Sequence, residues 1–321
     1  MSFPESLLEE YQSYLPPLTK RPDFDEFWAR TIAEKEAVPL DAVLERQDYP
    51  SPYVRVYALT YAGFDGTPVH GWYLLPAFTP PGKLPVLIQY HGFTGSRGYP
   101  HEYLPWVMLG MAVVAVDCRQ QGGDTGTRAR FSTGLTGNVN SQGLLDPEEY
   151  YYRAVYMDCM KAIDFAAARP ELDETRIVLT GVSQGGALTM ALAALDSRPC
   201  AAMADVPSNS NIEVRIEGEY GSFSSVTEYL RRYPDRLSQV YAALSYFDTM
   251  NLADRITCPV FASVALRDTT CPAKCFYATY NRITAPKQIV AYPFNGHDGC
   301  RALQMERKMA YLAEQGILNR E

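Results

Sequence analysis

Apolar residues in this chain form short continuous runs that alternate with segments of helical periodicity. The runs lie at 85–88, 112–116, 176–180, 201–205, 260–266 and 288–292. Helical patterns cover about 149–168 and 185–195, and others follow positions 272 and 299. Strands that are apolar on both faces, with helices between them, are typical of a parallel sheet covered on both sides. The pattern predicts an α/β fold with a mostly parallel, doubly wound sheet.

The segment before these runs has a different period. Val54, Val56 and Ala58 alternate with polar or larger residues, and a second strand pattern at 69–75 follows the turn at 64–67. Alternation with a period of two is typical of strands that bury one face. We therefore expect an antiparallel hairpin on the N-terminal side of the parallel sheet.

The 321 residues are consistent with one large domain over 1–321, because no repeat or linker divides them. A helical extension is expected over about 1–50, with Asp23 and Glu26 capping a helix that runs to Glu36. Two long segments, 118–148 and 207–257, interrupt the strand and helix alternation. Long insertions of this kind usually form lids or interfaces, so we expect them over the carboxyl edge of the sheet or at a subunit contact.

The strongest chemical signal is Gly181-Val-Ser-Gln-Gly185, between a predicted strand and a predicted helix. Glycines beside the serine permit a tight turn, because a side chain there would collide with the neighbouring elements. The turn exposes the Ser183 hydroxyl at a helix N-terminus, where free N–H groups favour negative charge. Ser183 is therefore the predicted nucleophile.

A serine nucleophile needs a base, and the chain has four histidines. His297 lies in a polar, glycine-flanked loop directly after the last predicted strand, and we expect it to be the base. His70 falls within the predicted hairpin and is interpreted as structural. His101 lies in a loop or at a helix start, without a partner pattern, and His91 follows the strand at 85–88.

The third member is expected to be a carboxylate that orients the imidazole. Asp268 follows the strand at 260–266, so it emerges at the same sheet edge as the serine and the histidine. The order Ser, Asp, His resembles that of α/β hydrolases. The competing residues are less well placed: Asp254 precedes its strand, Asp298 adjoins the histidine, and Asp205 ends a different strand.

Two backbone N–H groups are expected to bind the oxyanion of the reaction. One belongs to Gln184, which follows the nucleophile, and the other to Phe93, in the turn after the strand at 85–88. Neither side chain needs to act in this role. The Phe93 ring is also interpreted as a loop aromatic that lines the pocket.

Composition limits the partners and the compartment. Hydrophobic residues make up 47% of the chain and charged residues 21%, and the net charge is −8. An acidic chain repels polyanions, so no nucleic-acid partner is expected.

The apolar runs are far shorter than a membrane span, and the first thirty residues show no export signal. Seven scattered cysteines, an odd number, predict a reducing cytoplasm, and Cys271 and Cys275 are interpreted as buried thiols, with no metal or other cofactor.

Several motifs together resemble one family, the acetyl xylan esterases and cephalosporin C deacetylases among the α/β hydrolases. They lie at 21–28, 98–101, 117–123, 143–147, 181–186 and 244–248, and in the loop that holds His297. The resemblance implies an α/β-hydrolase fold and an acyl-serine mechanism on small acetyl esters. It also implies a homohexamer, a trimer of dimers whose catalytic pockets face an internal cavity.

Three positions depart from the family pattern. Gln120 replaces a glycine of the Arg-Gly-Gln signature, Asp298 replaces a glutamate beside the histidine, and Phe93 replaces a tyrosine in the oxyanion turn. These differences affect substrate preference and local stability more than the reaction class. If position 120 needs a positive φ, the local backbone must adjust.

Two alternative functions are open from the sequence. A peptidase or broad acyl hydrolase could use the same triad, although the chain has no β-propeller of the kind that gates related peptidases. A catalytically inactive assembly protein could keep the fold, but it would be expected to have lost a triad residue. The leading hypothesis is a serine esterase that removes acetyl groups from small sugars such as xylo-oligosaccharides.

Overall fold

The computed structural model describes residues 3–78 and 82–318, which contain one nine-stranded sheet. Residues 1–2, 79–81 and 319–321, which the single-domain prediction includes, lie outside the described residues. The strands are β1 (Val43–Gln47), β2 (Val54–Ala62), β3 (Pro68–Pro76), β4 (Leu84–Tyr90), β5 (Ala112–Val116), β6 (Leu172–Val182), β7 (Pro199–Asp205), β8 (Val260–Ala265) and β9 (Lys287–Tyr292).

The strand order across the sheet is β1-β2-β3-β5-β4-β6-β7-β8-β9. Strands β4 to β9 are parallel to one another, whereas β1, β2 and β3 pair antiparallel and β3 joins the parallel part antiparallel to β5. The predicted doubly wound sheet with an N-terminal antiparallel hairpin is confirmed. Strand β1 was not predicted, because its sequence Val-Leu-Glu-Arg-Gln forms a solvent-exposed edge strand without apolar alternation.

Eleven α-helices occur within the described residues. They are α1 (Phe3–Gln12), α2 (Phe24–Glu36), α3 (Leu104–Met108), α4 (Tyr151–Ala167), α5 (Gln184–Leu195), α6 (Ile212–Glu217), α7 (Ser224–Arg232), α8 (Leu237–Leu244), α9 (Thr249–Leu252), α10 (Ala273–Tyr280) and α11 (Arg301–Glu314). No helix in this part of the chain has the length and apolar character needed to cross a bilayer.

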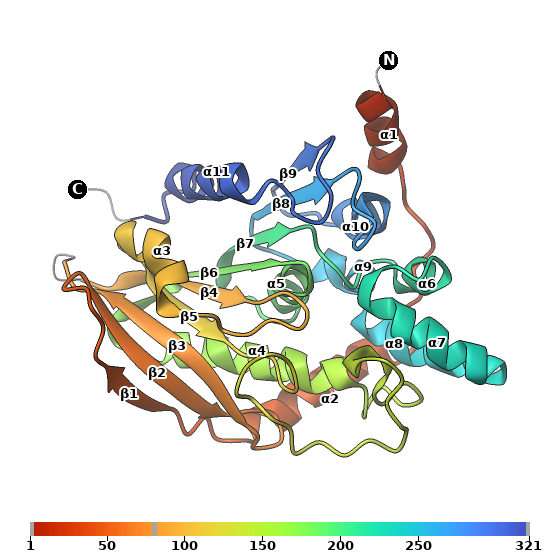
Figure 1. Cartoon of the computed structure of the whole chain (residues 1–321), viewed down its shortest axis with the longest axis horizontal. Coiled ribbons are helices and arrows are strands. Elements are labelled where there is room, and N and C mark those ends of the chain that lie inside the picture. The colour runs from red at the N-terminus through yellow and green to blue at the C-terminus, as the bar shows by residue number, and fades with distance from the viewer. Residues whose placement is uncertain (1–2, 79–81, 319–321) are drawn as a thin grey trace.

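Helices cover both faces of the sheet (Figure 1). Helices α3 and α11 lie on one face, where Trp106 and Tyr311 pack against the strands. Helices α4, α5 and α10 lie on the other face, and α2 packs outside α4. Both faces of the central strands are buried, which explains why their sequences are continuously apolar.

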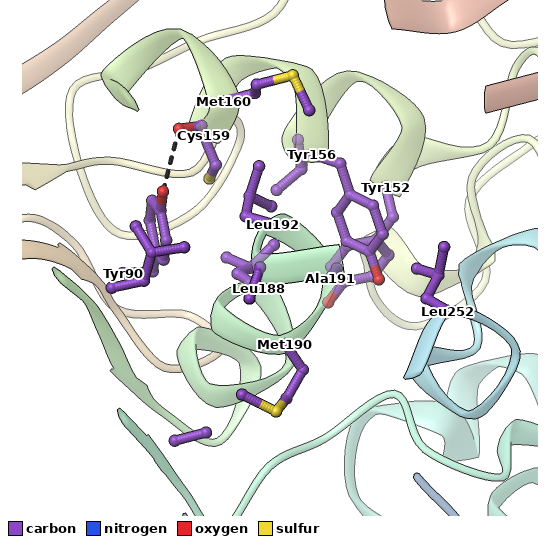
Figure 2. Close-up of a cluster of buried hydrophobic side chains, with 14 of the residues drawn as sticks. Tyr90, Tyr152, Tyr156, Cys159, Met160, Leu188, Met190, Ala191, Leu192 and Leu252 are labelled. Atoms are coloured by element: carbon purple, nitrogen blue, oxygen red, sulfur yellow. Dashed lines mark hydrogen bonds between the residues drawn. The ribbon is translucent and has the colours of Figure 1, made fainter. Parts of the chain in front are cut away.

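Helix α5 is buried on all sides between the sheet and α4 (Figure 2). Leu188 and Leu192 belong to the same buried cluster as Met160 of α4. The Tyr90 hydroxyl donates to the Cys159 carbonyl at 3.1 Å, which links the end of β4 to α4. A helix that is apolar on all sides is stable only inside a core. This packing fixes the position of the α5 N-terminus.

The capping interaction predicted for α2 is wrong. Asp23 precedes the helix, but its side chain makes no hydrogen bond to the first turn. It accepts instead from the Tyr246 hydroxyl, and the Trp28 indole donates to the Tyr246 carbonyl at 3.2 Å. Asp23 thus binds Tyr246, which is distant in sequence, instead of the first turn of α2. This hydrogen bond connects the start of α2 to the 207–257 segment.

The two long segments contact each other within the chain. Asn138 donates to the Ser222 carbonyl at 3.0 Å, and Asn140 donates to the Ser222 hydroxyl at 2.9 Å. Gln239 of α8 donates to the Leu145 carbonyl at 3.0 Å. The 207–257 segment contains α6, α7, α8 and α9, and its first part lines the carboxyl edge of the sheet, as Figure 1 shows.

A buried ion network holds the start of the 118–148 segment. The Arg119 guanidinium donates to Asp158 at 2.7 and 2.8 Å and to Asp65 at 3.0 and 3.1 Å. Burial by itself would lower the pKa of Arg119, but the two carboxylates raise this pKa above its ordinary value. These paired hydrogen bonds to two carboxylates give the buried Arg119 guanidinium its acceptors.

The next residue, Gln120, adopts a left-handed backbone conformation with a φ of 56°. Its amide donates to the Thr125 carbonyl at 2.8 Å, and its side chain is exposed. The backbone therefore keeps the conformation that suits glycine, although the residue has a side chain. A left-handed non-glycine residue costs roughly 1–2 kcal/mol, so this position is strained.

Gln120→Gly should relieve this strain and raise the free energy of unfolding by about 0.5–1 kcal/mol, because glycine loses part of the gain through its more flexible unfolded state. Chemical denaturation would measure the change. Gln120→Ala retains the Cβ atom and is the matched control, expected to leave the stability nearly unchanged. Equal effects of the glycine and alanine variants would contradict the strain argument.

Candidate active site

Ser183 occupies a sharp turn between β6 and α5, with a φ of 60° and a ψ of −116°. Any Cβ at Gly181 would overlap the backbone of Gly185, and any Cβ at Gly185 would overlap the Tyr90 carbonyl oxygen. The Ser183 amide donates to the Asp205 carbonyl at 2.9 Å. Close packing of β4, β6 and α5 thus requires both glycines and leaves the serine at the carboxyl edge of the sheet.

The three predicted triad residues come together. The His297 Nε2 lies 3.0 Å from the Ser183 Oγ, and the His297 Nδ1 lies 2.8 Å from the Asp268 Oδ2. Ser183 follows β6, Asp268 follows β8 and His297 follows β9, so parallel strands bring residues distant in sequence to one edge. These distances allow a continuous hydrogen-bonded relay from the carboxylate to the hydroxyl.

Asp268 is held by more than the histidine. Its Oδ1 accepts the backbone N–H groups of Thr270 and Cys271, each at 2.8 Å. The carboxylate is fully buried, whereas the His297 side chain is 31% exposed. An oriented carboxylate on Nδ1 keeps the proton on that nitrogen and leaves Nε2 free to accept from the serine.

Asp298 shapes the histidine loop without contacting the imidazole. Its carboxylate accepts from the Asn295 side chain at 2.7 Å and from the amides of Gly296 and Cys300 at 3.0 and 3.2 Å. The Asn295 hydrogen bond, followed by that of the Cys300 amide, lowers the pKa of Asp298. The shorter side chain at this position therefore closes the loop that holds His297.

The other carboxylates considered from the sequence have different partners. Asp254 forms an exposed ion pair with Lys20 at 3.0 Å. Asp205 forms a buried ion pair with Lys308 of α11 at 2.7 Å, and it also accepts from Gln304 and Ser263. Neither carboxylate contacts His297.

The remaining histidines are engaged elsewhere. The His91 Nε2 accepts the Cys118 amide at 2.8 Å, and the His91 Nδ1 lies 2.7 Å from the Gly92 carbonyl. Because the backbone amide can only donate, His91 is held as the neutral Nδ1–H tautomer and acts as a structural support for the turn. His70 contacts Thr60, as a structural histidine of the hairpin should.

The residues expected to supply the oxyanion amides lie at the start of α5 and in the pocket wall. Gln184 is the first residue of α5, so its amide is one of those that a helix leaves without an intrahelical acceptor. Phe93 lines the same pocket as Ser183 and His297. The Gln184 side chain points into the protein, where its Oε1 accepts from Tyr152 and Gln121, each at 2.8 Å.

Gln121 is a positioning residue that the sequence analysis missed. Its Oε1 accepts the Thr94 amide at 2.8 Å, while its amide nitrogen donates to Gln184. It therefore ties the turn that carries Phe93 to the helix that carries the second oxyanion amide. The family signature marks this glutamine, but its contacts arise only when distant segments meet.

A pocket of about 850 Å³ opens above the serine. Its wall includes Ser208, Arg215 and Ser222 from the 207–257 segment and Cys271 from the loop after β8. The Cys271 Sγ lies 3.8 Å from the Ser183 Oγ. Cys271 and Cys275 are buried, free thiols, as predicted, and burial raises the pKa of Cys275 to about 11. The described residues hold no cluster of three metal-ligating side chains.

Comparison with known proteins gives consistent matches. The family model for acetyl xylan esterase matches residues 1–315. An acetyl xylan esterase structure from Paenibacillus sp. R4 is 41% identical, with a TM-score of 0.93, over 96% of this chain and 99% of that chain. Acetyl xylan esterase 1 from Thermoanaerobacterium sp. JW/SL YS485 is 29% identical, with a TM-score of 0.91, over 96% and 98%.

Among curated proteins, the acetyl esterase Axe7A of Xylanibacter ruminicola is 28% identical over 299 residues. The match covers 88% of this chain but only 65% of the length of that relative. The family model and both structures cover nearly the whole chain. The chain belongs to the acetyl xylan esterase family.

Proposed function

We propose that this chain is a serine esterase that removes acetyl groups from small acetylated sugars through a covalent acyl-enzyme. The observation that carries the proposal is the relay from Asp268 through His297 to Ser183, at 2.8 and 3.0 Å. The relay ends in a pocket large enough for a sugar unit. Membership of the acetyl xylan esterase family supports the acetyl ester as substrate class.

In the first step, the His297 Nε2 takes the proton of the Ser183 hydroxyl as the oxygen attacks the acetyl carbonyl carbon. The amides of Phe93 and Gln184 stabilise the developing oxyanion. The protonated imidazole, stabilised by Asp268, then gives its proton to the departing sugar oxygen. The acetyl group stays on the serine as an ester.

In the second step, His297 deprotonates a water molecule that attacks this ester. The same amides stabilise the second tetrahedral intermediate, and acetate leaves as Ser183 recovers its proton. Every proton transfer passes through the His297 Nε2, and the reaction needs no cofactor. Acetylated xylo-oligosaccharides and cephalosporin C are the substrates that we propose.

The alternatives receive less support. A peptidase or broad acyl hydrolase would use the same triad, but the two solved structures described above, at 41% and 29% identity, are named acetyl xylan esterases. An inactive assembly protein has no need for a triad with both hydrogen bonds formed. We also propose a cytoplasmic location, because all seven cysteines are free thiols.

We further propose self-association, with a hexamer as the expected assembly. Leu135, Tyr233 and Leu237 are exposed to 58%, 41% and 44%. Leu135 and Tyr233 line one surface hollow, between the 118–148 loop and α7. Exposed apolar side chains that gather on a surface are typical of protein contacts.

The proposed reaction is tested by acetate release from acetylated xylose, acetylated xylo-oligosaccharides and cephalosporin C. The wild-type chain should release acetate from the sugars, whereas Ser183→Ala should be inactive yet folded, because only the hydroxyl is lost. A fluorophosphonate probe should label the wild type and not the variant. Turnover by the alanine variant at the wild-type rate would contradict the nucleophile assignment.

Asp268→Asn should lower kcat by about 10⁴-fold, the loss known for the equivalent change in a serine protease. The asparagine oxygen would keep the two backbone N–H donors, so its amide would face the His297 Nδ1 and impose the wrong tautomer. Asp254→Asn, at the exposed ion pair with Lys20, is the matched control and should retain activity. A loss below about tenfold for Asp268→Asn would assign the role to another carboxylate.

Light scattering at micromolar concentration should give a mass well above the 35.9 kDa of one chain. If the pockets open into an interior cavity, acetylated oligosaccharides should react much faster than polymeric acetyl xylan. Leu135→Asp should weaken the assembly, because it places a charge in an apolar contact. A monomeric wild type, or equal rates on polymer and fragments, would contradict the assembly or the sieving, respectively.

A further inference from the structure

One wall of the pocket contains a buried arginine with no counter-ion among the described residues. Arg215 lies on α6, in the 207–257 segment, and is only 1% exposed. It nevertheless lines the pocket that also contains Ser183 and His297. The Arg215 side chain is therefore part of the wall of the space that the substrate enters.

The guanidinium of Arg215 is only partly satisfied. Its Nη2 donates to the Thr270 carbonyl at 3.0 Å and to the Tyr220 carbonyl at 3.4 Å. Its Nε and Nη1 are buried and meet no acceptor among the residues that the structure describes. No carboxylate of these residues lies within ion-pair distance of it, in contrast to Arg119, which binds Asp158 and Asp65.

An unpaired charge in this position is costly. Arginine stays protonated in proteins, so burial cannot be relieved by loss of the proton. A buried cation without an anion is normally strongly destabilising. The Phe223 ring, 5.0 Å from the guanidinium carbon, supplies some stabilisation but accepts no hydrogen bond from Nε or Nη1. An anion in the pocket would offset this unpaired charge.

The surroundings hold the guanidinium close to the reaction centre. Thr270, whose carbonyl binds Nη2, precedes Cys271, and the Cys271 Sγ lies 3.8 Å from the Ser183 Oγ. Gly221 leaves the space beside the guanidinium open, since a Cβ there would lie 3.3 Å from the Arg215 Nη2. A small ester on Ser183 and an anion on Arg215 therefore belong to one binding site.

We infer that Arg215 binds a carboxylate of the substrate, so that the enzyme prefers acetyl esters of acidic sugars such as acetylated uronic acids. The inference rests on the proposed esterase function and narrows its substrate class. The Nε–H and Nη1–H donors point to different edges of the guanidinium, so a carboxylate would accept from one of them through a charge-assisted hydrogen bond. The other charged groups that line the pocket are Glu102, Arg301 and, when protonated, His297.

A carboxylate can belong to the sugar or to the acyl group, and two substrate pairs separate these sources. Acetylated glucuronic acid is compared with acetylated glucose for the sugar side. Mono-4-nitrophenyl succinate is compared with 4-nitrophenyl butyrate for the acyl side. For the sugar pair, the wild type should favour the acidic member by roughly 10- to 100-fold in kcat/KM, the range expected for a charge-assisted hydrogen bond.

Arg215→Gln should remove this preference, measured as the ratio of kcat/KM for the acidic and neutral members of each pair. Arg215→Lys should retain part of this preference, because the positive charge remains while the guanidinium N–H donors are lost. Arg301→Gln is the matched control, since it removes one charge from an exposed position in the same pocket. If the control lowers the ratio as much as Arg215→Gln does, the preference comes from the overall positive charge of the pocket and not from a binding site at Arg215.

A measurement on the wild type keeps the test valid if the Arg215 variants fail to fold. Glucuronate should inhibit the hydrolysis of 4-nitrophenyl acetate at a concentration at least about tenfold lower than glucose. Equal inhibition by the two sugars, or no preference within either pair, would overturn the inference while leaving the esterase intact. A preference confined to the succinate pair would overturn the uronic acid assignment. Failure to hydrolyse any acetyl ester would instead overturn the proposed function.

Discussion

The close approach of β4, β6 and α5 is the constraint on which the site depends. The helix starts so near β4 that position 185 has no room for a Cβ beside the Tyr90 carbonyl. This contact forces the sharp turn that exposes Ser183 and aims the first amides of α5 at the pocket. Burial of α5 against the sheet and α4 stabilises the arrangement, so the strained turn is supported by the apolar core.

Polar groups below the pocket orient the residues that this packing brings together. The Asp205 carbonyl accepts the Ser183 amide, while its carboxylate binds Lys308, Gln304 and Ser263. Helix α11 is thereby attached to the same strand end that fixes the nucleophile. On the other side of the serine, Asp268 uses one oxygen for the backbone and the other for the histidine. Ser183 and Asp268 are thus each held by at least one contact that takes no part in the chemistry.

Catalysis and recognition come from different parts of the chain. The triad belongs to strand ends, whose positions follow from the parallel sheet. The pocket wall comes mainly from residues 89–103 and in part from the 207–257 segment, which the 118–148 loop supports through Asn138 and Ser222. Changes in that segment can alter the charge of the pocket without moving the relay. Arg215 is such a feature, because it places an unpaired cation beside a conventional esterase triad.

The sequence alone determined the parallel part of the sheet, its antiparallel hairpin and the positions of Ser183, Asp268 and His297, because apolar strand runs and loop residues directly after them are local patterns. The tertiary structure decided which polar groups meet. Asp23 resembles a helix cap, yet Tyr246, far along the chain, binds it instead. The sequence also could not show that Arg215 is buried without an ion-pair partner, because burial and pairing depend on every neighbour that folding brings near. Local patterns record propensity, whereas partners and burial are properties of the packed chain.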